Sequence, residues 1–160
     1  MVCLKIILAK RFAILKITNR EELIPLKNEI FQNVRDYVVN RIDPDFLIVF
    51  GSYAKESTHS ESDIDVAFYR QDYSFSSFEL FQTAQELADI IKIEVDLVDL
   101  QTASTVFAAQ VYSTGEVIYS KNERLRMELH MRTYSMYTKL NEERQPIIDE
   151  ILKRGSVYEK

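Results

Sequence analysis

The stretch FLIVFGS at residues 46–52, followed by SDIDVAFY at residues 62–69, determines the fold that we expect for this chain. The apolar half of the first stretch predicts a buried β-strand, which Gly51-Ser52 ends. The second stretch predicts another strand. Because side chains alternate between the two faces of a strand, Asp63 and Asp65 should lie on the same face.

Two carboxylates side by side in an otherwise apolar strand cost free energy. At about 4 Å separation and an effective dielectric constant near 20, the repulsion between two such charges is roughly 4 kcal/mol. A bound divalent cation offsets this repulsion, and ligands that are all oxygen suit magnesium or manganese better than zinc. Gly51-Ser52 adds a backbone turn and a hydroxyl where phosphate oxygens could sit.

Helical and strand patterns alternate along the rest of the chain, which indicates an α/β or α+β domain with a mixed sheet of about four strands. Hydrophobic periodicity predicts helices from Pro25 to about residue 41, over 78–91 and over 103–112, strands over 46–50, 63–69, 93–100 and 116–119, and a long C-terminal helix from about residue 125. Gly115 suits a left-handed cap at the end of the third helix. Pro146 should kink or break the last helix.

The strand predicted over residues 93–100 offers three more carboxylates. Glu94 and Asp96 share one face by alternation, whereas Asp99 lies on the other face with the apolar residues. Asp99 is therefore expected to start the following helix as a cap or turn residue.

The composition is that of an ordinary water-soluble domain, with 46% hydrophobic and 28% charged residues in a chain of 160. Residues 1–20 contain five basic and no acidic groups, which leaves 15 basic and 25 acidic groups, a net charge of −10, over residues 21–160. An acidic body argues against direct nucleic-acid binding. One cysteine and two isolated histidines exclude a disulfide framework and a thiolate zinc site. Residues 1–20 have too short an apolar run for a membrane span or signal sequence, and we expect a peripheral extension there.

The motif Gly51-Ser52, ten further residues, then Asp63-x-Asp65 resembles that of the nucleotidyltransferases related to DNA polymerase beta. The resemblance covers approximately residues 21–120 and implies a third metal-binding aspartate on the strand after the next helix, which matches Asp96. Asp63, Asp65 and Asp96 would then be the catalytic and metal-binding residues. Gly51, Ser52 and Lys55 would bind the nucleotide, although Lys55 stands where many relatives have arginine.

The small size is similar to that of the minimal nucleotidyltransferase (MNT) proteins, which accompany helical HEPN proteins in toxin–antitoxin modules. This resemblance implies a cytoplasmic antitoxin, in a hetero-oligomer, that transfers AMP from ATP to a hydroxyl of its HEPN toxin, with tyrosine as the favoured acceptor. Two Mg²⁺ ions, or Mn²⁺, would assist. Residues 1–20 would be an extension, 21–120 the nucleotidyltransferase core and 121–160 a helical segment.

Two alternatives stay open at this point. The first is a nucleotidyltransferase that modifies a small molecule such as an aminoglycoside, for which an acidic body would be suitable. The second is an antitoxin that neutralises by binding alone, which Glu56 supports because it places a negative charge where relatives have glycine.

Two groups of aromatic or sulfur side chains have no assigned role. Tyr53 could stack on a base or pack in the core. Met127, Met131, Tyr134 and Tyr137 recur at helical spacing, which predicts core packing against the sheet, with an exposed surface for a partner as the alternative.

Overall fold

A mixed four-stranded sheet forms the centre of the computed structural model, which describes residues 20–54 and 63–154. The elements follow the order α2 (Arg20–Ile42), β1 (Phe46–Phe50), β2 (Ile64–Tyr69), α3 (Ser77–Ile91), β3 (Val95–Asp99), α4 (Thr105–Thr114), β4 (Glu116–Ser120) and α5 (Glu123–Arg154). The predicted fold class, with about four strands and a long C-terminal helix, is confirmed.

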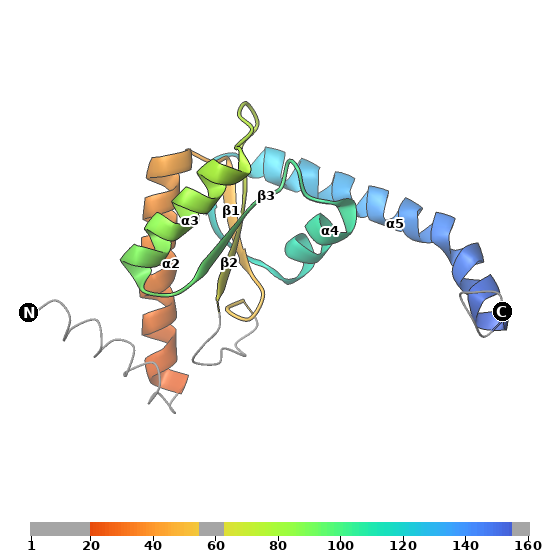
Figure 1. The fold of residues 1–160 in the computed structure, drawn as a ribbon, viewed down its shortest axis with the longest axis horizontal. Coiled ribbons are helices and arrows are strands. Elements are labelled where there is room, and N and C mark those ends of the chain that lie inside the picture. Colours follow the sequence, from red (N-terminus) through yellow and green to blue (C-terminus); the bar gives the residue numbers. More distant parts are fainter. Residues whose placement is uncertain (1–19, 55–62, 155–160) are drawn as a thin grey trace, which may run out of the picture.

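The sheet order is β3-β2-β1-β4. β1 pairs antiparallel with β2 and with β4, whereas β2 and β3 are parallel and are joined by α3. α2 and α3 cover one face of the sheet, and α4 covers the other face together with the first part of α5 (Figure 1). β1 is buried along its whole length, as its unbroken apolar sequence predicts.

Several helix boundaries differ from the sequence expectation for identifiable reasons. α3 starts at Ser77 because Ser76 and Glu79 form a capping box. Phe78 and Phe81 of this helix are 72% and 63% exposed. α4 begins after the N-cap Ser104.

One local prediction about the helices was wrong. Gly115 caps α4 in an extended conformation with φ of −85°, not in a left-handed one. A Cβ at this position would lie 2.3 Å from Cγ2 of Ile48 and 2.6 Å from the carbonyl oxygen of Val111, so close packing explains the glycine. Pro146 was expected to kink or break the last helix: α5 does not break there but continues to Arg154, and it bends in its C-terminal part (Figure 1).

No helix in the described part of the chain is long and apolar enough to cross a membrane. The expectations for residues 1–20 fall outside the described residues, apart from Arg20 at the start of α2.

Candidate active site

Two of the predicted site residues lie side by side at one end of the sheet. Asp65 is the register partner of Phe50, the last residue of β1, and also of Asp96 near the start of the parallel strand β3. Since register partners project to the same face of a sheet, the two carboxylates are neighbours. Asp65 is half-buried and Asp96 is exposed.

The third carboxylate, Asp63, immediately precedes β2 and is exposed to solvent. Burial raises the pKa of Asp65, and the negative charges of Asp96 and Asp63 raise it further. The structure therefore brings together the three aspartates that the sequence singled out, and we call the part of the sheet that carries them the carboxylate end. A cation among these three side chains would relieve their repulsion.

Gly51 opens the space that the Asp65 side chain occupies. Its φ of +71° lies in the left-handed region, which residues with a Cβ rarely adopt. A Cβ built at this position would lie 2.0 Å from Oδ2 and 3.1 Å from Cγ of Asp65. The sequence assigned Gly51 to the turn and to the phosphates; its contact with Asp65 arises only because β1 and β2 pair in this register.

The remaining predicted nucleotide-binding residues follow Gly51 along the chain. Ser52 is half-buried in the same turn, and Lys55 lies outside the described residues. Tyr53 is only 8% exposed and belongs to the core on the α2 and α3 side of the sheet, so it packs in the core. Burial raises the pKa of Tyr53, and the nearby charge of Asp63 adds to the effect.

Asp99 lies at the far end of β3, opposite Phe68, and is 2% exposed. Its Oδ1 accepts a hydrogen bond of 2.9 Å from the main-chain N–H of Gln101, which makes it a turn residue as predicted. Its Oδ2 is buried and has no hydrogen-bond partner in the described part of the chain. Burial raises the pKa of Asp99, and the Gln101 hydrogen bond lowers it only in part. Asp99 is therefore separate from the carboxylate end.

The three aspartates form an open set of oxygen donors. In residues 20–54 and 63–154, no three acidic, histidine or cysteine side chains already surround a single point as a closed metal cage would. Mg²⁺ commonly uses one or two carboxylates together with waters and substrate phosphates. Oxygen donors that repel each other at an accessible end of the sheet fit that coordination chemistry.

Aromatic packing beside Asp65 supports the end of β1. Phe50 meets Phe107 of α4 edge to face, with ring centroids 5.5 Å apart. Both rings belong to the core on the α4 side of the sheet. This contact anchors α4 beside the strand that ends in the Gly51 turn, so the carboxylate end rests on a packed surface.

Comparison with protein families identifies the family to which this fold belongs. The family model described as "Polymerase beta, Nucleotidyltransferase" matches residues 32–124, a range that includes all four strands. The chain belongs to this family of nucleotidyltransferases.

Similarity to individual proteins is more specific. The protein adenylyltransferase MntA of Shewanella oneidensis is 34% identical over 126 residues, which is 79% of this chain and 87% of that protein. A crystal structure of a toxin–antitoxin with AMP-PNP matches with a TM-score of 0.69 and 32% identity, over 76% of this chain and 98% of that chain. A chain in the structure of the tri-AMPylated S. oneidensis HEPN toxin in complex with MNT antitoxin matches with a TM-score of 0.61 and 31% identity, over 79% of this chain and 96% of that chain. These similarities confirm the resemblance to the minimal nucleotidyltransferases.

Proposed function

We propose that this protein is an antitoxin that transfers AMP from ATP to a hydroxyl, that of a tyrosine, on a HEPN-family toxin. The observation that supports this proposal most directly is the register pairing of Asp65 with Asp96, with Gly51 leaving room for the Asp65 carboxylate. The relative MntA is a protein adenylyltransferase. The structures with AMP-PNP and with an AMPylated toxin contain chains similar to this one.

Each aspartate has a distinct part in the proposed reaction. Asp63, Asp65 and Asp96 would hold Mg²⁺, most simply as two ions and with Mn²⁺ as a substitute, which would neutralise the charge of the phosphates. Asp96 is exposed, which leaves it accessible to an incoming group, and we assign it as the acceptor of the hydroxyl proton. Asp65 is half-buried and lies beside Gly51. It would therefore fix the position of the carboxylate oxygens that hold the metal.

The bond changes are those of an in-line displacement. The toxin hydroxyl oxygen forms a bond to the α-phosphorus of ATP while the bond from that phosphorus to the bridging oxygen of the β-phosphate breaks. Pyrophosphate leaves, and the hydroxyl proton passes to Asp96. Phosphoryl chemistry of this type depends mainly on positioning and charge neutralisation. Gly51 and Ser52 would position the phosphates, and Lys55 would add a positive charge.

The organisation and location of the protein are part of the same proposal. Residues 21–120 would form the nucleotidyltransferase core, residues 121–160 a helical segment and residues 1–20 an extension. A hetero-oligomer with the toxin in the cytoplasm is expected, with no direct contact to nucleic acid. The acidic charge of residues 21–160 supports a protein acceptor over an RNA acceptor.

A transfer assay tests the proposal. The purified full-length protein is incubated with labelled ATP, Mg²⁺ and a HEPN toxin from the same genome, and the toxin mass is measured. Addition of one or more AMP units to the toxin is expected. The double variant Asp63→Asn with Asp65→Asn should abolish the addition, whereas Glu94→Gln, which changes an exposed carboxylate next to β3, should preserve it.

Three other results would contradict the proposal. Label only on an added small molecule would identify a small-molecule nucleotidyltransferase. A tight complex with no label on the toxin would identify a binding antitoxin. Full transfer by the double variant would show that the carboxylates of Asp63 and Asp65 are not needed for the reaction.

A further inference from the structure

The outer face of α3 carries exposed aromatic side chains that nothing in the described part of the chain covers. Phe78 and Phe81 lie about one helical turn apart and are 72% and 63% exposed. Gln85 and Asp89 continue the same side of the helix over the next turns, and both are exposed. We call these four side chains the α3 outer face. Helix α3 lies on the outside of the molecule beside α2 (Figure 1), so this face is open to a partner.

The charge of α3 is negative. The helix contains three carboxylates, those of Glu79, Glu86 and Asp89, and no basic residue. Glu86 already has partners, since it accepts a hydrogen bond from Tyr37 and lies 3.7 Å from Arg41. Asp89 has no ion-pair partner among the residues that the structure describes. An occupant of the α3 outer face should therefore combine apolar side chains with positive charge.

A groove extends this surface from α3 towards α2. Ile90, which follows Asp89 in the chain, is 55% exposed and lines the groove. The other lining residues all belong to α2 and are Asn33, Asp36, Tyr37, Asn40 and Arg41. The groove therefore connects the α3 outer face with the exposed side of α2.

Residues 1–19 have a composition that complements this surface. They contain Lys5, Lys10, Arg11 and Lys16 and no acidic residue. Most of the others are apolar, as in the runs IILA at 6–9 and FAIL at 12–15. Apolar side chains in this number need a surface to cover them. The segment therefore offers the two properties, apolar surface and positive charge, that fit α3.

Residues 1–19 can reach the α3 outer face from the point at which they join α2. That point is Arg20. Because a helix rises about 1.5 Å per residue, Asn33 at the groove lies about 20 Å along α2, and Phe78 lies about 18 Å along α3 from Ile90. An extended chain spans about 3.3 Å per residue, so residues 1–19 reach up to about 60 Å. This length exceeds the two steps together.

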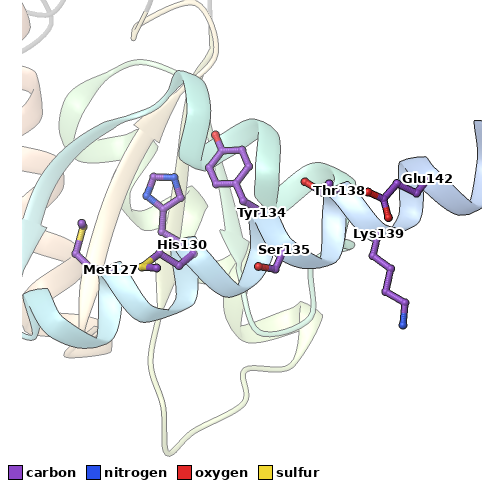
Figure 2. Close-up of a pocket in the computed structure, with 8 residues that line it drawn as sticks. Met127, His130, Tyr134, Ser135, Thr138, Lys139 and Glu142 are labelled. Atoms are coloured by element: carbon purple, nitrogen blue, oxygen red, sulfur yellow. The ribbon is translucent and has the colours of Figure 1, made fainter.

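A second exposed apolar surface, on α5, differs in charge. Met127 and Met131 are 46% and 70% exposed and line a shallow groove with His130 and Tyr134 (Figure 2). The sequence predicted core packing for these methionines, with an exposed surface as the alternative, and the alternative describes them correctly. Residues 123–140 carry four basic and two acidic groups. A basic segment is therefore attracted to α3 and repelled by this part of α5.

We propose that residues 1–19 fold back over the α3 outer face, with apolar side chains on Phe78 and Phe81 and basic side chains beside Asp89. The contact removes two aromatic rings from water. It also gives a positively charged neighbour to a carboxylate that has no ion-pair partner in the described part of the chain.

The carboxylate end stays accessible in this arrangement. Ile64 and Val66 belong to the core on the α2 and α3 side of the sheet. Asp65 lies between them in the strand, so its side chain projects to the opposite face. A segment that covers α3 therefore does not cover Asp65.

A paramagnetic label on Cys3 tests the contact in the full-length protein. Cys3 is the only cysteine, so a nitroxide attaches at one position without any substitution. Amide signals of α3 from Phe78 to Asp89 should lose most of their intensity relative to the sample with reduced label. Signals of residues 123–140 should keep theirs. Equal loss in both helices, or no loss in α3, overturns the proposal.

Charge variants of the labelled protein test what holds the segment in place. Asp89→Lys should restore most of the α3 intensity, because the new positive charge repels the basic segment. Glu143→Lys, which changes another exposed carboxylate, on α5, is the matched control and should leave the loss of intensity unchanged. Lys10→Glu together with Arg11→Glu should also restore the intensity, and adding Asp89→Lys to that pair should reverse part of the recovery. Identical spectra for Asp89→Lys and Glu143→Lys would contradict the proposed contact.

Two further measurements detect other occupants. Labelled protein is mixed with isotopically enriched protein that carries no nitroxide, and loss of the α3 signals in this mixture would show that the segment binds a second copy. Binding of the unmodified protein to phosphatidylserine vesicles, with full α3 signals in the labelled sample, would assign the segment to a membrane surface. Either result overturns the proposal. Because the readout is the distance from Cys3 to α3, the outcome is independent of the AMP-transfer proposal.

Discussion

Replacing Gly51 with alanine tests whether this glycine is needed to make room for the Asp65 carboxylate, and not only to form the turn. The backbone at this position has φ of +71°, and the left-handed conformation costs a residue with a Cβ roughly 1–2 kcal/mol. The new methyl group would also lie 2.0 Å from Oδ2 of Asp65, and overpacking of that kind typically costs about 1–3 kcal/mol. The free energy of unfolding should therefore fall by about 2–4 kcal/mol, with rotation of the Asp65 side chain limiting the loss.

The effect on transfer should exceed the effect on folding. If Asp65 moves by about 1 Å to escape the methyl group, the rate should fall by about 10²-fold, the usual consequence of such a misplacement. Mn²⁺ affinity, measured by electron paramagnetic resonance without nucleotide, should fall as well. That measurement reports on the carboxylates independently of toxin and ATP.

Gly115→Ala is the matched control. Its Cβ would clash with Ile48 and with the Val111 carbonyl oxygen, but none of its close neighbours is an aspartate. This variant should lose stability and still transfer AMP normally at temperatures at which it is folded. Normal Mn²⁺ affinity and transfer in Gly51→Ala would refute the argument that Gly51 makes room for Asp65.

Three further variants test other parts of the structure. Asp96→Asn should lower the transfer rate by about 10²–10⁴-fold, the usual contribution of a general base, with little change in ATP binding; a near-normal turnover would remove Asp96 as the proton acceptor. Burial raises the pKa of Asp99 above its ordinary 3.8, so the folded state binds this proton more tightly than the unfolded state. The folded state therefore loses stability as the pH rises from 3.8 through the raised pKa of Asp99. Asp99→Asn should therefore be more stable than the unmodified protein in urea at neutral pH, with the difference shrinking as pH falls towards 3.8, and a constant difference would contradict this account. Tyr53→Phe should keep normal ATP affinity in a nucleotide-binding titration, since the ring is 8% exposed and packs in the core; a large loss of affinity would show that the hydroxyl contacts the nucleotide.

The sequence predicted the strands and the carboxylate face because both depend on local patterns. Alternation along one strand placed Asp63 and Asp65 together, and alternation along the next separated Asp96 from Asp99. The pairing between strands is not local. That Asp65 and Asp96 are register partners depends on how α3 joins two parallel strands, which no spacing in the sequence specifies.

Burial was the weaker part of the sequence analysis. Met127 and Met131 are apolar and helically spaced, and the pattern predicted core packing for them with an exposed surface as the alternative, yet both are exposed, as are Phe78 and Phe81 of α3. Periodicity shows that a helix has an apolar face but not which element covers it. The left-handed cap predicted at the end of α4 was also wrong. A glycine after a helix suits such a cap, whereas Gly115 is needed because a Cβ would prevent close packing.

Among the strands of residues 20–54 and 63–154, β3 is an outer strand of the sheet, and this position gives its charges a second role. An outer strand presents unpaired main-chain N–H and C=O groups, which can pair with the strand of another molecule and start aggregation. Exposed charged side chains on such a strand oppose that pairing. Asp96 is exposed on β3, and the exposed Glu94 lies just before the strand. The carboxylate that we propose as the proton acceptor would therefore also protect the outer side of this strand, so solubility and the proposed reaction would favour the same residue.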